Sequence, residues 1–178
     1  FEHLGLGEIL TWGAFTYPFA FLVTDLCNRR FGPAATRVVV VVGFALAVAL
    51  SIWLATPRIA IASGSAFLAA QMLDVAVVDR LRRRQWWQAP LISTFAGSLL
   101  DTAIFFSLAF AAVFSGLDTA FGVEDGSLAF PVPLLGGEAP LWLSLALGDL
   151  TVKIVLGLAM LAPYRALLGL LRPAPALR

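Results

Sequence analysis

The sequence has little of what a soluble enzyme is built from. Charged residues make up 13% of its 178 residues and hydrophobic residues 60%, against about a quarter and about half in an average globular domain. The lone Cys27 has no partner for an internal disulfide, and the lone His3 excludes a histidine or Cys-His metal cluster. No Gly-x-x-x-x-Gly-Lys-Ser/Thr run is present, so any use of ATP requires another chain. The sequence therefore predicts no cofactor, no metal and no water-soluble enzyme.

Long apolar runs take the place of charge, and the mean hydropathy is +0.91. A helix needs about 20 mostly apolar residues to cross the hydrocarbon core of a membrane. Stretches of this kind run over residues 10–27, 38–54, 59–78, 91–114 and 141–161. The stretch 38–54 carries no charge, whereas a soluble helix of this length alternates polar and apolar faces. We therefore expect an all-α, polytopic transmembrane bundle, a single domain over residues 1–178.

The basic residues predict the orientation of this bundle, because arginines in short loops stay on the cytoplasmic side. Of the 12 basic residues, ten lie between spans one and two, between spans three and four, or after span five: Arg29, Arg30, Arg37, Arg80, Arg82, Arg83, Arg84, Arg165, Arg172 and Arg178. The other side holds Arg58 and these acids: Glu2, Glu8, Asp118, Glu124, Asp125 and Glu138. We expect residues 115–140 to form an external loop and the C-terminus to be cytoplasmic. The odd number of spans also predicts an upstream helix, which would make six in the native protein.

The expected surroundings are the lipid bilayer rather than a nucleic acid, since the net charge is only +1. The basic tract from Arg80 to Gln88 joins two spans, and the positive-inside rule and the interfacial tryptophan belt account for it. Gly43 and Ala47, on the charge-free second span, permit either contact with a second copy in a homodimer or contact within the bundle.

Five ionisable side chains interrupt the predicted spans: Asp25, Asp74, Asp101, Asp149 and Lys153. Each costs about 2.5–3.5 kcal/mol at the bilayer centre on insertion scales, and such groups usually face a cavity or a partner. Asp101 lies near the middle of the span 91–114 and is the deepest. It is therefore our first candidate for binding.

Helical spacing shows what accompanies these acids. A polar stripe with i, i+4, i+7, i+11 spacing runs through Asp101: Thr94, Ser98, Asp101 and Phe105. The stripe is either a cavity wall or a close contact between helices, for which Ser93 and Gly97 also leave room. Asp149 and Lys153 have i, i+4 spacing with the acid first, which favours an ion pair within one helix. That pair either belongs to a site or neutralises itself for structural reasons.

Two further groups of polar residues lie in the first and third spans. Gln71 and Asp74 share a helix face and present an amide beside a carboxylate, either to a ligand or to a neighbouring helix. The first span is unusually polar: Thr16, Tyr17, Thr24, Asp25 and Asn28. Pro18 frees a backbone carbonyl there, and interrupted helices of this type often line transport sites, although a simple kink is the alternative.

Several blocks of the sequence resemble the queuosine precursor transporter family. The first block is Thr11-Trp-Gly-Ala-Phe-Thr-Tyr-Pro-Phe-Ala-Phe-Leu-Val-Thr-Asp-Leu26, and the others are Arg30-Phe-Gly, Ala35-Thr-Arg37, Arg58-Ile-Ala-Ile-Ala-Ser63, Gln71-Met-Leu-Asp-Val75, Arg80-Leu-Arg, Trp86-Trp-Gln-Ala-Pro90, Ser93-Thr with Gly97, Asp101-Thr, and Lys153 with Pro163-Tyr164. The resemblance spans nearly the whole chain. It departs from the family in the missing first transmembrane helix, in a longer external loop, and at Ser98, where some relatives carry asparagine.

The resemblance implies an inner-membrane importer of 7-cyano-7-deazaguanine and 7-aminomethyl-7-deazaguanine, similar in fold to the substrate-binding subunits of energy-coupling-factor transporters. A 7-deazaguanine presents two adjacent N–H donors and one carbonyl acceptor. One carboxylate can accept both donors, and Gln71 or Lys153 can serve the carbonyl. The aromatic rings available to flank the base are Trp12, Phe19, Phe67, Phe105 and Phe106.

We expect a carrier that works by alternating access of a central polar cavity. Asp101 and the Gln71/Asp74 pair lead the candidate substrate-binding residues. The remaining candidates are Asp25, Asp149, Lys153, Thr24, Ser98, Thr94, Trp12 and Phe105. The alternatives are a binding subunit that depends on a separate ATPase module, and an intramembrane enzyme with Asp74 and Asp101 as catalytic carboxylates.

Overall fold

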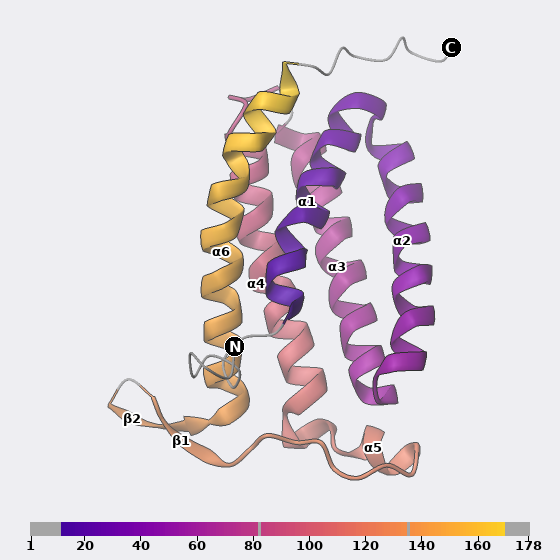
Figure 1. The fold of residues 1–178 in the computed structure, drawn as a ribbon, viewed down its shortest axis with the longest axis vertical. Coiled ribbons are helices and arrows are strands. Elements are labelled where there is room, and N and C mark those ends of the chain that lie inside the picture. The colour runs from indigo at the N-terminus through magenta and orange to yellow at the C-terminus, as the bar shows by residue number, and fades with distance from the viewer. Residues whose placement is uncertain (1–11, 82, 135, 170–178) are drawn as a thin grey trace.

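The protein is a bundle of five long helices in a computed structural model that describes residues 12–81, 83–134 and 136–169, with side chains in the first helix described from Tyr17 on (Figure 1). The long helices are α1 (Trp12–Phe31), α2 (Pro33–Leu54), α3 (Pro57–Leu81), α4 (Gln88–Phe110) and α6 (Leu141–Leu168). Proline begins both α2 and α3, a position where its missing N–H costs nothing. Gly32 alone separates α1 from α2, with a φ of 86° that favours glycine.

Four of these helices, α2, α3, α4 and α6, are long and apolar enough to cross a membrane. In the described part of the chain α1 does not meet this measure, because Asp25, Asn28, Arg29 and Arg30 make its second half polar. The all-α transmembrane bundle is confirmed. The first predicted span, residues 10–27, corresponds to α1, a 20-residue helix packed within the bundle.

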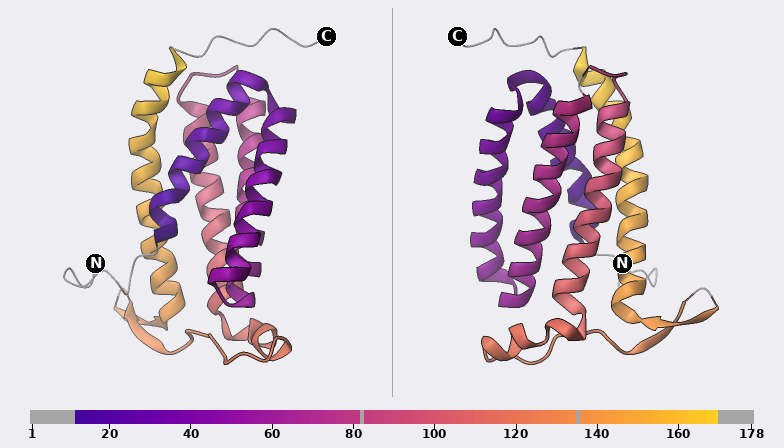
Figure 2. Two further views of the ribbon diagram at one scale, coloured as in Figure 1. Left: turned by 45° about the vertical axis from the view of Figure 1, so that its right-hand side comes forward. Right: turned by 180° about the vertical axis from the view of Figure 1, so that it is seen from behind.

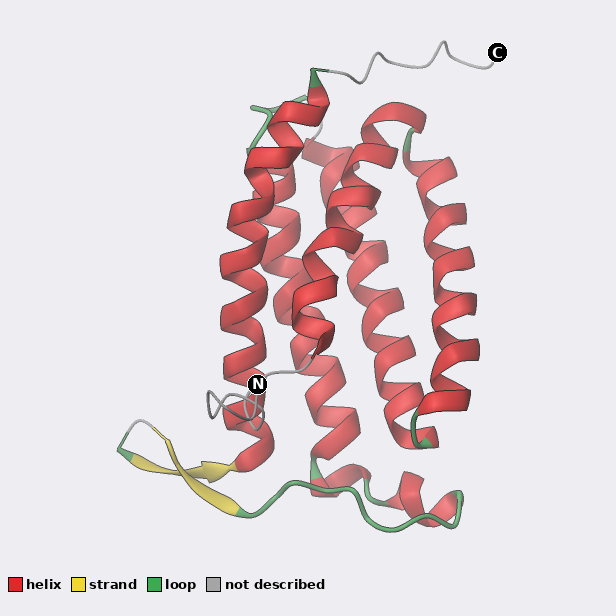
Figure 3. Cartoon of the chain, viewed as in Figure 1, coloured by secondary structure: helices red, strands yellow, loops and turns green. Residues whose placement is uncertain are grey.

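The segment predicted as an external loop is partly ordered into secondary structure (Figure 3). It contains the short helix α5 (Gly116–Ala120) and an antiparallel hairpin of β1 (Pro131–Leu134) and β2 (Gly137–Pro140). The predicted span 91–114 is too long, since α4 ends at Phe110 and a 3-10 helix, η2, follows at Ala112–Phe114. The chain leaves the helix at Ala111, whose ψ of 134° is extended.

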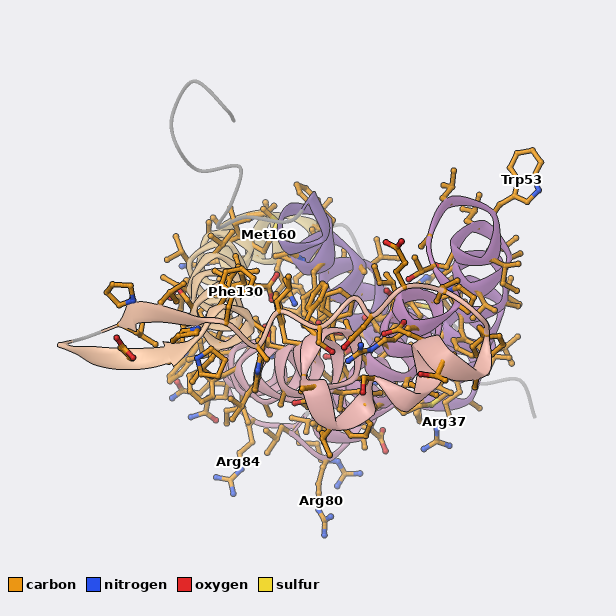
Figure 4. All side chains as sticks on the ribbon, turned by 90° about the horizontal axis from the view of Figure 1, so that it is seen from below. Arg37, Trp53, Arg80, Arg84, Phe130 and Met160 are labelled. Atoms are coloured by element: carbon orange, nitrogen blue, oxygen red, sulfur yellow. The ribbon has the colours of Figure 1, made fainter. Side chains whose placement is uncertain are left out.

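The connections divide between the two ends of the bundle as the arginines predict. In Figure 1 the turn between α1 and α2, the link between α3 and α4 and the end of α6 lie at one end. The turn between α2 and α3 and the whole segment from η2 to β2 lie at the other. We call these the arginine-rich end and the external end. Arg37, Arg80 and Arg84 are exposed, and their side chains extend beyond the ribbon in Figure 4.

Helix α3 packs against α4, α2 and α1, and α6 packs against α4 and α1 (Figure 2). Helix α2 covers one side and exposes most of its apolar residues. Trp53 is 88% exposed and projects away from the bundle (Figure 4). Exposed apolar side chains of this kind fit a lipid environment. Gly43 and Ala47 face inward instead, toward Phe67 and a cavity respectively.

Two close contacts hold α4 against its neighbours. A Cβ on Gly97 would lie 2.5 Å from the ring of Phe21 on α1, and a Cβ on Gly157 of α6 would overlap the methyl group of Thr94. Small residues at such crossings let backbones approach closely in a membrane. The close-contact interpretation of the polar stripe therefore holds at Gly97 and Thr94.

Candidate functional site

The centre of the bundle holds an ammonium group between two carboxylates. Lys153 Nζ lies 2.5 Å from Asp149 Oδ2 on its own helix and 2.6 Å from Asp101 Oδ2 on α4. The i, i+4 ion pair predicted within α6 is confirmed, and Asp101 joins it from a neighbouring helix. We call these residues the central triad. One cation with two carboxylates leaves the triad with a formal charge of −1.

Neighbouring residues hold Asp149 and Lys153 in place. Thr102 Oγ1 donates to Asp149 Oδ2 at 2.9 Å, so Asp149 has partners on both α4 and α6. The ammonium of Lys153 also lies 4.6 Å from the centre of the Tyr17 ring, a favourable cation–π distance. Tyr17 in turn donates from its hydroxyl to the carbonyl of Gly97 at 2.9 Å. Helices α1, α4 and α6 therefore meet at the triad.

A cavity of about 450 Å³ lies against the triad. Its walls come from α1, α2, α3, α4 and α6: Tyr17, Ala20, Ala47, Ser51, Ser63, Gly64, Ala66, Phe67, Asp101, Phe105, Asp149 and Lys153. A volume of this size suits a small ligand, and apolar walls with a few convergent polar groups are typical of ligand pockets. The cavity-wall interpretation of the polar stripe holds for Asp101 and Phe105.

Asp101 is the acid best placed for a ligand. It is 7% exposed, against 2% for Asp149, and it contacts Lys153 through Oδ2. Asp149 is occupied by both Lys153 and Thr102. Asp149 is therefore the more fully engaged acid, and Asp101 keeps capacity to accept further hydrogen bonds. Aromatic rings of Tyr17, Phe67 and Phe105 line the same cavity.

A second acidic cluster lies nearer the arginine-rich end, between α1, α3 and α4. Asp74 accepts hydrogen bonds from Ser93 and from Thr24, whose Oγ1 is 3.0 Å from Asp74 Oδ2. The carboxyl groups of Asp25 and Asp74 are within hydrogen-bonding reach of each other. Both acids are buried, at 2% and 0% exposure. We call Asp25 and Asp74 the carboxyl pair.

The structure separates other predicted site residues from the central triad. Gln71 is fully buried, its side-chain amide has no hydrogen-bond partner, and it lines a different cavity, of about 300 Å³, beside Thr24 and Phe67. Ser98 is also buried without a side-chain partner. Asp74 and Asp101, the acids of the enzyme alternative, belong to different clusters. The side chain of Trp12 lies outside the described residues.

Arg58 is the residue whose role the sequence did not reveal. It is 1% exposed, and its guanidinium binds Asp118 at 2.5 Å and the carbonyls of Leu108 and Ala111 at 2.8 and 2.6 Å. Its guanidinium therefore satisfies carbonyls at the end of α4, where the helix stops. The predicted external arginine is thus a buried anchor between α3, α4 and α5.

The external segment carries a further hydrogen-bonded acid. Ser127 donates from its hydroxyl and its backbone N–H to Asp125, which holds the pKa of that carboxyl below its usual range. Asp125 also lies 3.5 Å from Arg58 but is 60% exposed at its side chain, so this outer contact is screened by water.

Together these features define a class of protein: a multi-pass α-helical membrane protein with a charged, ligand-sized cavity between its helices. The chain belongs to the family described as "Putative vitamin uptake transporter", whose profile matches residues 11–56 and 49–167. The predicted family resemblance is confirmed. No solved structure matches the chain significantly.

Three curated relatives are similar to this chain in sequence. The chain is 35% identical to the queuosine precursor transporter of Escherichia coli (strain K12), over 93% of this chain and 76% of that protein. It is 40% identical to the "Probable queuosine precursor transporter" of Haemophilus influenzae, over 56% of this chain and 52% of the relative. It is 30% identical to the protein of the same name in Bacillus subtilis, over 61% of this chain and 59% of the relative. These relatives are named as transporters, not as enzymes.

Proposed function

We propose that the protein carries queuosine precursors across the bacterial inner membrane, with its C-terminus in the cytoplasm. The names of its relatives support the substrate class, and the four apolar helices support the membrane setting. The single observation that carries the proposal is the central triad in a ligand-sized cavity, because intramembrane charges that line a cavity commonly mark a substrate pathway.

The triad suits a 7-substituted 7-deazaguanine. The carboxylate of Asp101 accepts the ring N–H and the 2-amino group, and the ammonium of Lys153 donates to the ring carbonyl. Aromatic side chains in the cavity wall stack on the flat base. The formal charge of −1 also favours the cationic aminomethyl precursor over the neutral cyano precursor. Both are proposed as substrates.

Transport follows alternating access of the central cavity, since the charged groups lie between helices rather than at either end. In this proposal the chain acts as a self-sufficient carrier. In the competing proposal it is the binding subunit of a complex with a separate ATPase module. Gly43 and Ala47, the small residues that suggested a homodimer, face into the bundle. A homodimer therefore has no support from these two residues and remains a prediction.

Ligand binding tests the proposal directly. Purified protein in detergent is titrated with guanine, 7-cyano-7-deazaguanine and 7-aminomethyl-7-deazaguanine while its unfolding temperature is followed, because a ligand that binds only the folded state raises it. Both 7-substituted bases should raise the unfolding temperature. Asp101→Asn should lose that response, and Asp125→Asn, an exposed acid in the external segment, should keep it. If no deazapurine shifts the wild-type protein, the proposed substrate class is wrong.

A further inference from the structure

The carboxyl pair is the second buried acidic group, and substrate binding at the central triad does not use it. Asp25 on α1 and Asp74 on α3 are within hydrogen-bonding reach of each other. Two ionised carboxylates in contact repel strongly, so such a pair holds one proton between its members. Among the described residues, neither acid forms an ion pair with a lysine or arginine.

The surroundings of Asp74 favour a shared proton over a metal ion. The hydroxyls of Thr24 and Ser93 both donate to Asp74, so its oxygens already accept hydrogen bonds from two helices. Within the described residues, no group of three or more acidic, histidine or cysteine side chains forms a metal site. An ionised Asp74 that accepts hydrogen bonds from these hydroxyls, next to a protonated Asp25, fits this arrangement.

A small cavity, lined mostly by apolar residues, lies beside Asp25. Asp25 Oδ1 is buried without a hydrogen-bond partner, and Asp25 lines a cavity of about 10 Å³ together with Thr94 and Tyr164. This volume is about that of one water position. The hydroxyl of Tyr164 accepts a hydrogen bond from Arg29 Nε at 2.7 Å. Asp25 and Tyr164 therefore line one small cavity on the side of the predicted cytoplasmic end.

Helix α1 links the carboxyl pair to the substrate cavity. Its residues Tyr17 and Ala20 line the central cavity, and its residues Thr24 and Asp25 belong to the acidic cluster. The separation from Tyr17 to Asp25 is about 12 Å along the helix at 1.5 Å per residue. Phe21 lies between them in the sequence, with its ring centre 4.6 Å from that of Tyr17.

The titratable and charged groups that face the pair are few. Arg29 of α1 and Tyr164 of α6 lie on the side of the arginine-rich end. Tyr17 lies on the side of the cavity, with the central triad beyond it. Helix α4 contributes the hydroxyls of Ser93 and Thr94, which are not titratable groups. The pair is therefore the proton-holding group between the cavity and the cytoplasmic end.

We propose that the Asp25–Asp74 pair binds a proton that enters with the substrate and is released to the cytoplasm through the Asp25 side, which makes the protein a proton-coupled importer. The proposal rests on the proposed transport function. In one cycle the proton comes from external water, resides between the two carboxyl groups while the substrate crosses, and returns to cytoplasmic water. Movement of α1 couples substrate transport to proton transfer, because this helix carries residues of both the central cavity and the carboxyl pair.

Uptake by the full chain in proteoliposomes tests whether import is coupled to protons. The probe is labelled 7-cyano-7-deazaguanine, which is neutral and does not itself respond to the membrane potential. Potassium and valinomycin on both sides hold that potential at zero. An inward proton gradient of about one pH unit permits about tenfold accumulation for one proton per substrate. We expect wild-type protein to accumulate the probe under this gradient and to lose accumulation when a protonophore is added.

Variants separate the pair from the substrate site. Asp74→Asn and Asp25→Asn should exchange labelled for unlabelled probe at equal pH yet fail to accumulate it under the gradient. Asp79→Asn, the same substitution further along α3, should accumulate it like the wild type. A fluorescent pH indicator inside vesicles containing wild-type protein should report acidification when the probe is added outside. This last measurement needs no variant and so does not depend on how the variants fold.

Several results would overturn the inference. Wild-type uptake could be indifferent to the proton gradient, could follow a sodium gradient instead, or could leave the internal pH unchanged. Either Asn variant could accumulate the probe normally, or could lose exchange together with accumulation, which would assign the pair to substrate binding or folding. Failure of the wild-type protein to bind any deazapurine would instead contradict the proposed function itself.

Discussion

At the scale of single residues, Lys153 has the most demanding position in the bundle. Its ammonium is the cation shared by Asp101 and Asp149, and all three side chains are buried. In a membrane interior such charges persist only because they neutralise one another. Removal of the ammonium leaves two carboxylates facing each other without a cation.

We therefore predict that Lys153→Met destabilises the protein by about 3–5 kcal/mol, the usual cost of leaving one side of a buried ion pair uncompensated. The measurement is the unfolding temperature in detergent. Val155→Met serves as the control, because this neighbour on the same helix is 59% exposed. Equal unfolding temperatures for the two variants would show that the triad is not held together by its charge.

At the scale of elements, the crossing of α4 and α6 depends on one glycine. A Cβ on Gly157 would overlap the methyl group of Thr94, so Gly157→Ala forces the two helices apart. Overpacking of this kind costs about 1–3 kcal/mol. We predict a lower unfolding temperature for Gly157→Ala and recovery in the double variant with Thr94→Ser, which lacks that methyl group. A double variant no more stable than Gly157→Ala would place the strain elsewhere.

The external end depends on a second element contact, made by Arg58. Lysine at this position keeps the charge but cannot reach Asp118 and the carbonyls of Leu108 and Ala111 together. We predict that Arg58→Lys loosens residues 115–140 and speeds their cleavage by protease added to right-side-out vesicles. Arg83→Lys, an exposed change at the other end, is the control. An unchanged cleavage rate in Arg58→Lys would contradict the anchor.

Helices were more predictable from the sequence than the contacts between them. Hydropathy and bounding charges placed the long helices, because lipid requires continuous apolar surface. The ion pair of Asp149 and Lys153 was also predictable, since both lie on one helix. Asp101 as their third partner and Arg58 as an anchor were not, because those contacts join helices far apart in the sequence. The carboxyl pair was missed for the same reason, as helical spacing linked Asp74 to Gln71 instead of Asp25.

At the scale of the whole molecule, charge is sorted into three places. Most arginines gather at one end, acids that include the buried Asp118 lie in the segment at the other, and four other buried acids and Lys153 occupy the space between. The arginines predict the orientation in the membrane. The third set is buried within the bundle, so the positive-inside rule does not account for it. This separation supports the proposal that the central cavity binds the substrate.

Uptake by the purified chain alone tests the central claim most directly. Liposomes that contain only this protein are loaded with unlabelled 7-aminomethyl-7-deazaguanine, and entry of the labelled compound is measured without ATP or any other protein. The account predicts rapid exchange by the wild-type protein and loss of exchange in Asp101→Asn. Binding without exchange in the wild type would contradict a self-sufficient carrier and favour a subunit that needs an ATPase partner. Undiminished exchange in Asp101→Asn would contradict the assigned site.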